Sequence, residues 1–577
     1  MRGRDPALST ILLLLGVRAL AAPDLPAYSV TDLKALGIWP VAMNEKGQVL
    51  GRACCGRQSA APQLYTAGNV RDLGLPPGGY SSFTPQGIND SSWVVGHAEI
   101  PSSDPAARVS SAAFHDGSVW SVIDTSAFGT ITTGTVINNA GQVVGTTQNV
   151  PDTTYTPWLY QGGSLTRLAP GPICFAGDIS ENGRVVGSCG FDFSPRSWLY
   201  HDGQLTDLPI AGRATAVNDA GTVLSIVPRT WYAGAGWRGP YYYILRAGVS
   251  TELPGPPAAM NERSELAGGL GFPRATLYRS GTFIDLGTLG GTSSGADSLN
   301  NRGQIAGWSL DATGATRAFV FDDGVMLDVA SLRGVGSALG FSSALSVKAT
   351  INDSLYVLVA VADYSTEPDT LDAAYLLTPM APTVTLAAKP TQTPVRQPVA
   401  LTWVSENANR CVASGGTTGD GWSGMRATSG ETTVMSGAAG DVQYAIRCTA
   451  GPLSGEATVS VRYEAAPPIV RLSVTPSETR VGRSVTLAWT SEGADSCVAT
   501  GGRPGDGWMG ALATSGQTTI SEAAQGIVEY GLRCTAAALA SEAKVSVTYT
   551  KKPGGGGSLD ALGVLLLGLV LSRRKAN

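Results

Sequence analysis

The segment INNAGQVVG, residues 137–145, is one of eight related copies along the chain. The others begin at residues 43, 88, 179, 217, 260, 299 and 351 and read MNEKGQVLG, INDSSWVVG, ISENGRVVG, VNDAGTVLS, MNERSELAG, LNNRGQIAG and INDSLYVLV. An apolar residue, then Asn-x-x-Gly, then alternating apolar residues is typical of a β-hairpin. Asn hydrogen-bonds forward to its own backbone and Gly accepts a positive φ, so the motif carries the chemistry of a turn.

The turn position is Ser180 in one copy and Asn in the other seven, namely Asn44, Asn89, Asn138, Asn218, Asn261, Asn300 and Asn352. We interpret the repeat as architecture; a ligand site built on these Asn side chains is the less favoured alternative. The mean period is 44 residues, which matches one four-stranded blade of a β-propeller at ~40–45 residues.

The remaining strands of each unit can also be found. A third strand follows each hairpin, as in WLYQGG and WLYHDG, and a fourth follows it in all units but the last. The missing strand is supplied by YSVTDL at Tyr28–Leu33, which precedes the first hairpin. We therefore expect this N-terminal strand to complete the eighth blade and close the ring, since closure removes exposed sheet edges.

The repeat array resembles the HAF-repeat extracellular family, which is named for a His-Ala-Phe tripeptide. The resemblance is clearest over Asp285–Val329 and extends over roughly residues 28–380, with Arg317-Ala318-Phe319 in place of His-Ala-Phe. Membership of that family implies a secreted or surface-exposed, propeller-like repeat protein, but it implies no established reaction.

A different module follows the repeats and occurs twice, at residues 383–464 and 468–550. The copies are offset by 86 residues, so that Trp403 matches Trp489 and Tyr444 matches Tyr530. Short alternating strands with a Cys pair and a strand Trp indicate an Ig-like sandwich. These copies resemble the Ig-like modules of secreted bacterial proteins, although the first Cys follows the Trp here. The predicted fold class is therefore all-β, with an eight-bladed β-propeller at 22–380 followed by two tandem Ig-like β-sandwiches.

The eight cysteines fit an exported, oxidising setting. We expect one disulfide within each module. A third disulfide should join the two cysteines that lie six residues before and six residues after the turn Ser180–Gly183. The predicted pairs are Cys411–Cys448, Cys497–Cys534 and Cys174–Cys189. Cys54 and Cys55 form either a vicinal bridge or two thiols, and the sequence leaves both open.

The two ends of the chain look like export signals. Residues 1–21 have Arg2 and Arg4, an apolar run and Ala19-Leu20-Ala21, as in a secretory signal peptide. Residues 551–577 contain a glycine spacer, a short apolar run, and a basic tip; the key residues are Gly554, Gly555, Gly556, Gly557, Arg573 and Arg574. The tail resembles the GlyGly-type sorting signals of Gram-negative bacteria.

This resemblance implies transient insertion into the inner membrane, removal of the tail by a rhomboid-type sorting protease, and release to the cell surface or medium. The alternative is a plain C-terminal membrane anchor, although the apolar run is shorter than the ~20 residues of an ordinary membrane-spanning helix. In both cases the protein is exported.

Two aromatic residues are candidate ligand contacts. Trp422 and Trp508 lie in matching segments, GDGWSG and GDGWMG. Exposed, they would form a platform for sugar rings; the favoured alternative is that each Trp folds over the edge of its sandwich.

No catalytic, metal-binding or cofactor motif is found in the sequence. His115 and His201 sit at equivalent ends of third strands, where we expect exposed positions near turns rather than catalytic groups. We therefore expect no catalytic residues, no metal and no cofactor. The net charge of −5 and the lack of a basic stripe argue against a nucleic-acid partner.

The sequence favours a non-enzymatic, exported binding or adhesion protein whose propeller is displayed on an Ig-like stalk and binds an unknown polysaccharide or protein ligand. The alternative is a secreted propeller hydrolase or lyase acting on carbohydrate or peptide. Acidic or His residues gathered at one mouth of the channel would favour the enzyme, and an aromatic, uncharged face would favour the binding protein.

Overall fold

The computed structural model describes residues 24–55, 59–102, 109–150, 152–190, 195–228, 230–232, 236–271, 273–336, 339, 346–363, 370–536 and 538–551. The chain forms two compact units. The first comprises Met1–Val384 with Ser405–Cys411 and Arg447–Glu456, and the second comprises the rest. The predicted signal peptide at 1–21 and the sorting residues Gly554–Gly557, Arg573 and Arg574 lie outside the described residues. Within those residues, no helix has the length and apolarity to cross a membrane.

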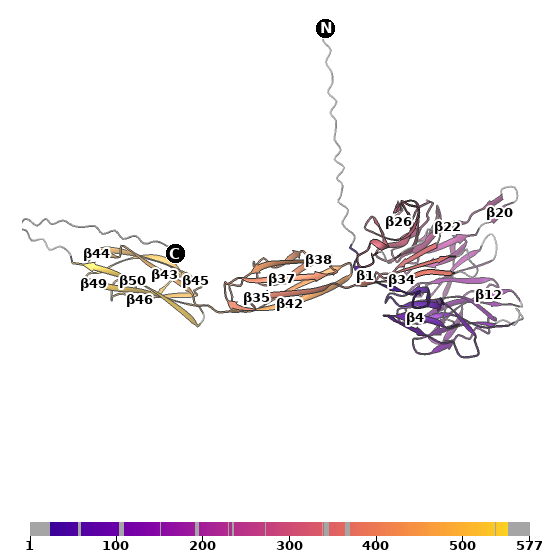
Figure 1. Ribbon diagram of the computed structural model, residues 1–577, viewed down its shortest axis with the longest axis horizontal. Helices are drawn as coiled ribbons and strands as arrows, with labels where there is room; N and C mark the ends of the chain where they lie inside the picture. The colour runs from indigo at the N-terminus through magenta and orange to yellow at the C-terminus, as the bar shows by residue number, and fades with distance from the viewer. Residues whose placement is uncertain are drawn as a thin grey trace, which may run out of the picture. The chain divides into compact units, whose positions relative to one another are not determined.

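The described part of the chain is all-β, with one short 3-10 helix, η2 (Val329–Ser331). The first unit is a β-propeller-like succession of four-stranded antiparallel runs, which appear in Figure 1 in indigo to salmon. Their order is β2 (Ile38–Met43)–β3 (Val49–Ala53)–β4 (Pro62–Thr66)–β5 (Asn69–Asp72); β6 (Ser82–Ile88)–β7 (Val94–Ile100)–β8 (Val109–His115)–β9 (Trp120–Val122); β10 (Ile131–Ile137)–β11 (Val143–Asn149)–β12 (Thr154–Gln161)–β13 (Ser164–Arg167); β14 (Cys174–Ile179)–β15 (Val185–Cys189)–β16 (Arg196–His201)–β17 (Gln204–Ala211); β18 (Arg213–Val217)–β19 (Val223–Val227)–β22 (Tyr241–Arg246)–β23 (Val249–Leu253); β24 (Pro257–Met260)–β25 (Leu266–Gly268)–β26 (Thr276–Arg279)–β27 (Thr282–Asp285); β28 (Gly290–Leu299)–β29 (Ile305–Asp311)–β30 (Thr316–Asp322)–β31 (Val325–Asp328); and β32 (Ser346–Ile351)–β33 (Val357–Asp363)–β34 (Thr370–Met380)–β1 (Ala27–Asp32).

Two features depart from simple repetition. The second and third runs share one eight-stranded sheet, because β8 and β10 pair in parallel at Ser110 and Ile131. A separate hairpin, β20 (Thr230–Tyr232) and β21 (Gly236–Arg238), is inserted between β19 and β22. The first strand of nearly every run also contains a β-bulge, which shifts the phase of its side chains close to the turn.

The N-terminal strand β1 completes the last sheet, as the sequence predicted. It pairs antiparallel with β34 from Ala27–Met380 to Asp32–Tyr375. The two strands lie side by side in Figure 1. Further backbone bonds fix both ends of β1, since Leu33 N donates to Ala374 O at 2.8 Å and Tyr28 N donates to Arg333 O at 2.8 Å. The last sheet is therefore built from both ends of the repeat array.

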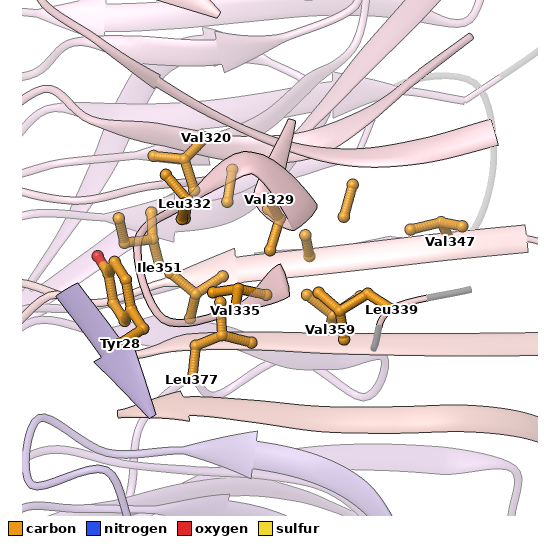
Figure 2. Packing of buried hydrophobic residues seen from close by; sticks show 14 of the residues in the cluster. Tyr28, Val320, Val329, Leu332, Val335, Leu339, Val347, Ile351, Val359 and Leu377 are labelled. Carbon is orange, nitrogen blue, oxygen red and sulfur yellow. The ribbon is translucent and has the colours of Figure 1, made fainter. Parts of the chain in front are cut away.

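Tyr28 anchors β1 in a continuous apolar core. Its side chain is fully buried among Leu377 of β34, Ile351 at the end of β32, and the segment after η2 that carries Leu332 and Val335 (Figure 2). Gly334 in that segment has φ +85°, and a Cβ there would clash with the carbonyl oxygen of Tyr28. A glycine is needed at this point because the backbone of β1 packs directly against it.

The second part of the chain contains two successive pairs of packed sheets. In the first pair, the sheet of β35 (Thr383–Lys389), β37 (Val399–Glu406) and β40 (Ser429–Val434) accompanies that of β36 (Gln392–Pro394), β42 (Leu453–Glu464), β41 (Gly440–Ala450), β38 (Arg410–Gly415) and β39 (Gly424–Arg426). In the second pair, β43 (Ile469–Thr475), β45 (Ser484–Glu492) and β48 (Ser515–Ser521) accompany β44 (Glu478–Arg480), β50 (Leu539–Thr550), β49 (Gly526–Ala536), β46 (Ser496–Gly501) and β47 (Ala511–Leu512).

The three predicted disulfides are present. Cys174 and Cys189 are direct partners across β14 and β15, and Cys497 and Cys534 are direct partners across β46 and β49. Cys411–Cys448 joins the neighbouring strands β38 and β41 in the same way. Each module disulfide therefore lies within one sheet, whereas that of an antibody domain links its two sheets. Cys55 carries an exposed thiol.

We expect Tyr28→Ala to destabilise the first unit by roughly 3–5 kcal/mol, because removing a buried aromatic ring leaves a cavity at the strand that closes the last sheet. Tyr28→Phe should be neutral or slightly stabilising, because the Tyr28 hydroxyl is buried without a hydrogen-bond partner among the described residues. The measurement is thermal unfolding of the full chain. Tyr241→Ala is the matched control, since Tyr241 is 36% exposed; equal losses for the two Ala variants would contradict the anchoring role of Tyr28.

Candidate functional site

The turn asparagines form a closed ring of hydrogen bonds. In a typical turn, Asn138 Oδ1 accepts the backbone N–H of Gln142 at 3.0 Å, while its Nδ2 donates to Gln142 Oε1 at 2.7 Å and to Ser180 O in the next turn at 3.0 Å. The same Nδ2-to-carbonyl bond to the following turn is made by Asn44, Asn89, Asn218, Asn261, Asn300 and Asn352, at 2.8–3.1 Å. The last bond, from Asn352 to Asn44 O, returns to the first turn.

Ser180 is the exception, and its neighbours compensate for the missing amide. Ser180 Oγ accepts the backbone N–H of Arg184 at 3.1 Å, as an Asn would, but it is too short to reach the next turn. Asn182 Nδ2 and an Arg184 guanidinium nitrogen instead donate to Asp219 O, at 3.0 and 2.9 Å. The connection from this turn to the next is therefore kept with different side chains.

All seven asparagines are buried, with exposures of 2–8%. Their amide groups are used for bonds within the protein, which agrees with the interpretation of the motif as a turn. Asn261, Asn300 and Asn352 also line a cavity beside the turns, and each donates through Nδ2 to the carbonyl of the following turn.

A second ring is formed by the residues that follow the turn asparagines. In each case a side-chain oxygen accepts a backbone N–H from the preceding turn; Glu181 accepts from Asn139 and Glu262 accepts from Asp219, both at 2.8 Å. The other acceptors are Asp90, Asn139, Asp219, Asn301, Asp353 and Glu45. We call this set of eight residues the carboxylate ring, although two members are amides.

The carboxylate ring concentrates acidic groups along the closed ring of turns. Burial raises the pKa values of Glu45, Glu181 and Glu262, and repulsion from the neighbouring carboxylates of the ring adds to the effect. Acidic residues at one mouth are the arrangement that would favour an enzyme. Here each carboxylate already accepts a backbone N–H, however, and no metal-binding group of His, Cys, Asp and Glu is found in the described part of the chain.

A cavity of about 550 Å³ lies beside these rings. Its wall comes from β2, from the ends of β24 and β28, and from β32 with the facing residues of β33. Lys348 and Thr350 of β32 line it together with Trp39 of β2, while Glu45 and Glu262 line it at the turns. Sites for small organic ligands typically have volumes of ~300–1,000 Å³, so this one is large enough to admit such a ligand.

Trp39 also lines a second hollow, of about 490 Å³. That hollow is formed by β2, β3 and the start of β6, and it includes Arg52, Ser59 and Thr84. Arg52 is the cross-strand partner of Trp39, and its guanidinium carbon lies 5.7 Å from the centre of the indole. The central cavity and the second hollow therefore have the Trp39 side of β2 in common.

Two buried carboxyl groups, each on the first strand of its four-stranded run, have raised pKa values. Burial raises the pKa of Asp178 to about 6 and that of Asp297 to about 6. Each accepts a backbone N–H of the next run, Asp178 from Val217 at 3.0 Å and Asp297 from Ala349 at 2.9 Å. A carboxyl group with such a pKa can exchange a proton near neutral pH.

Our sequence reasoning did not single out Trp39, Arg52, Lys348, Asp178 or Asp297. A signal was available, because in the five residues before each turn the only charged side chains are Asp178, Arg213, Asp297 and Lys348, and the only Trp is Trp39. Aligning the eight turns would have exposed these departures from a neutral pattern.

The less favoured interpretation of Trp422 and Trp508, a sugar-binding platform, is wrong, and the alternative of a Trp folded over its sandwich agrees with their burial. Their side chains are 0% and 2% exposed. Trp422 Nε1 donates to the carbonyls of Ser414 and Ala445, and its ring meets Trp403 edge-on at 5.6 Å; Trp508 makes the equivalent contacts in the second module. The aspartate before each loop turns the Trp inward, since Asp420 Oδ1 accepts Trp422 N at 2.9 Å.

The expectation that His115 is exposed is also wrong. It is 5% exposed, accepts the backbone N–H of Gly117 through Nδ1 at 3.0 Å, and packs against Trp120. Burial, followed by the charge of Arg71, lowers the pKa of His115. His201 is partly exposed and lies 3.4 Å from Asp202, on β16, in a different run of strands from His115 on β8.

No family model and no curated protein matches this chain. Among solved structures, the acylaminoacyl peptidase of Pyrococcus horikoshii is similar at 11% identity and a TM-score of 0.32, over 57% of this chain and 57% of the peptidase. TolB from Acinetobacter baumannii is similar at 12% identity and a TM-score of 0.24, over 61% of this chain and 80% of TolB. Murine CEACAM1b aligns over its full length with 30% of this chain, at 16% identity and a TM-score of 0.14. The chain thus spans little more than half of the peptidase.

We expect Asn138→Ser to lower the stability of the first unit by about 1–3 kcal/mol, because Ser can accept within its own turn but loses both bonds of the amide nitrogen, to Gln142 Oε1 and to Ser180 O. Asn149→Ser is the matched control, since within the described residues the Asn149 amide nitrogen donates only to the exposed Asp152. Thermal unfolding of the two variants tests the ring; a loss no larger for Asn138→Ser than for Asn149→Ser would show that the cross-turn bond is dispensable.

A carboxyl group whose pKa is raised by folding stabilises the fold at low pH, and this contribution is lost as the pH rises through about 6. We therefore expect the unfolding free energy of the wild type, relative to Asp297→Asn, to increase by about 2 kcal/mol between pH 7 and pH 4. Unfolding curves at several pH values provide the measurement.

Asp72→Asn is the control of opposite sign. Burial alone would raise the pKa of Asp72, but hydrogen bonds from Gly74, Ser59 and Gln63 outweigh it and lower its pKa. The stability contributed by Asp72 should therefore be lost as the pH falls. The same slope for both variants would contradict the assignment of the Asp297 carboxyl group.

Proposed function

We propose that this chain is a non-enzymatic, exported binding or adhesion protein that holds a polysaccharide or protein ligand in its first unit. In this proposal, residues 22–380 form an eight-bladed β-propeller. Residues 383–464 and 468–550 are Ig-like modules that act as a disulfide-stiffened stalk. The observation that carries the proposal is the central cavity of about 550 Å³, in which an aromatic and a cationic side chain stand among hydroxyl and amide groups.

The closed hydrogen-bond rings support this role because they make the cavity wall rigid. Ligand sites whose side chains are held in place before binding lose less conformational freedom on association. The three disulfides favour an oxidising location outside the cytoplasm. We further propose that the tail at 551–577 inserts transiently into the inner membrane and is removed by a rhomboid-type sorting protease, so that the protein reaches the cell surface or the medium.

A secreted hydrolase or lyase acting on carbohydrate or peptide is the second candidate. It is favoured by Asp178 and Asp297, because carboxyl groups with pKa values near 6 suit proton transfer at neutral pH. It is disfavoured by their hydrogen bonds, since each of these carboxylates links one run of strands to the next and is therefore explained by architecture.

The test is a binding screen of the full chain, with its disulfides intact, against envelope and environmental polysaccharides and envelope proteins. Every ligand that binds is then incubated overnight with the protein and its products are analysed. We expect binding without any change in the ligand, and equal binding by Asp178→Asn and Asp297→Asn. Cleavage that either variant abolishes would replace the binding protein with the enzyme.

A further inference from the structure

The central cavity and the second hollow share Trp39, and away from the turns their charged side chains are cationic. The turn end of the central cavity is acidic. The carboxylate ring supplies Glu45, Glu262 and Asp353 to the turn end of the central cavity. Lys348 lies four residues before Asn352 on β32, which places it ~13 Å from the turn at 3.3 Å per residue. Within the described residues, Lys348 is the cationic side chain of the central cavity, and Arg52 is that of the second hollow. The region away from the turns is therefore basic and aromatic.

Lys348 is available to a ligand. Its residue is exposed, and no ion pair or hydrogen bond of its ammonium group occurs within the described part of the chain. The positive charge of Lys348 acts on the Asp297 carboxyl group. One oxygen of that carboxylate already accepts the backbone N–H of Ala349 at 2.9 Å, however. Arg52 is likewise exposed and stacks over Trp39.

We propose that Trp39, Lys348 and Arg52 form a binding site for an acidic polysaccharide, a chain of sugars bearing carboxylates. The indole face that Arg52 does not cover packs against the apolar face of a sugar ring, and the two cations stand one in each adjoining hollow, where they meet successive carboxylates. Thr350 in the central cavity and Ser59 and Thr84 in the second hollow supply partners for hydroxyl groups. This inference rests on the proposed binding function and adds the class of ligand.

A polysaccharide fits this region better than an extended acidic peptide. A peptide commonly binds by adding a strand to a regular sheet edge, but the edge of β2 is interrupted. Pro40 has no N–H, and a β-bulge at Val41 breaks the register between Pro40 and Ala42. A sugar chain needs no ladder of backbone bonds and is held by stacking and by charged side chains.

The net charge of −5 adds a further expectation. The protein as a whole repels a polyanion, so binding must come from the local cations and not from a general attraction. Adding salt screens the repulsion between distant charges first. Moderate salt should therefore weaken binding less than it weakens the binding of a polyanion to a basic protein surface.

The probe is a defined oligogalacturonide, compared by calorimetry with an uncharged oligosaccharide of equal length and with a poly-glutamate peptide, using the full chain. We expect the oligogalacturonide to bind about tenfold more tightly than either comparison ligand. We expect Lys348→Met and Arg52→Met each to weaken binding by roughly five- to tenfold, the usual effect of losing one charged contact. Trp39→Ala should weaken binding to the oligogalacturonide further.

Lys46→Met is the matched control, since it removes the same charge from an exposed position at the turn end, outside both hollows. Unfolding curves of every variant exclude loss of the fold as the cause. Equal binding of the uncharged chain or of poly-glutamate, or an unchanged affinity in Lys348→Met and Arg52→Met, would overturn the acidic-polysaccharide site and leave the binding function standing. Cleavage of a ligand, or no binding to any polysaccharide or envelope protein, would instead overturn the binding function itself.

Discussion

The hydrogen bond from the turn amide of one run to the turn carbonyl of the next is the interaction on which the first unit depends. Asn suits this position because it has one acceptor for its own backbone and two donors, of which one crosses to the neighbouring turn. The bond from Asn352 to Asn44 joins residues 308 apart in sequence and closes the ring at 2.8 Å. With β1 bound to β34, the circle is closed twice, once at the turns and once in the last sheet.

The carboxylate ring makes the turn end of the first unit acidic. Its side chains satisfy backbone N–H groups that would otherwise be left at the turns, and this requirement gathers acidic residues at one end. Their burial and mutual repulsion raise the pKa values of Glu45, Glu181 and Glu262. The acidic turn end is thus a consequence of how the turns are linked, and the basic side chains lie away from it, Lys348 in the central cavity and Arg52 in the second hollow.

The sequence predicted the features that depend on local chemistry or on strand register. Turn residues, the closing strand and the Cys174–Cys189 pair all follow from short patterns or from counting positions along a hairpin. The burial of His115 was not expected; it follows from packing against Trp120, its partner across the β8–β9 hairpin. For Trp422 the sequence favoured burial but could not establish it, because the indole is held by the carbonyls of Ser414 and Ala445 from other segments. The cavity was also inaccessible to sequence reasoning, because β2 and β32 are separated by about 300 residues and β-bulges shift the phase of the side chains that face it.

Repetition also explains why a ligand site must lie where the copies differ. Identical runs would place the same side chains before every turn, whereas these stretches contain, in all, a single Lys and a single Trp. Lys348 lies on β32, in the sheet that β1 completes, and Trp39 lies on the first run that follows. The proposed site at Lys348 and Trp39 therefore lies beside the seam where the two ends of the repeat array meet. Any ligand that contacts both sides of this seam favours the closed ring over the open one and so stabilises the first unit by mass action.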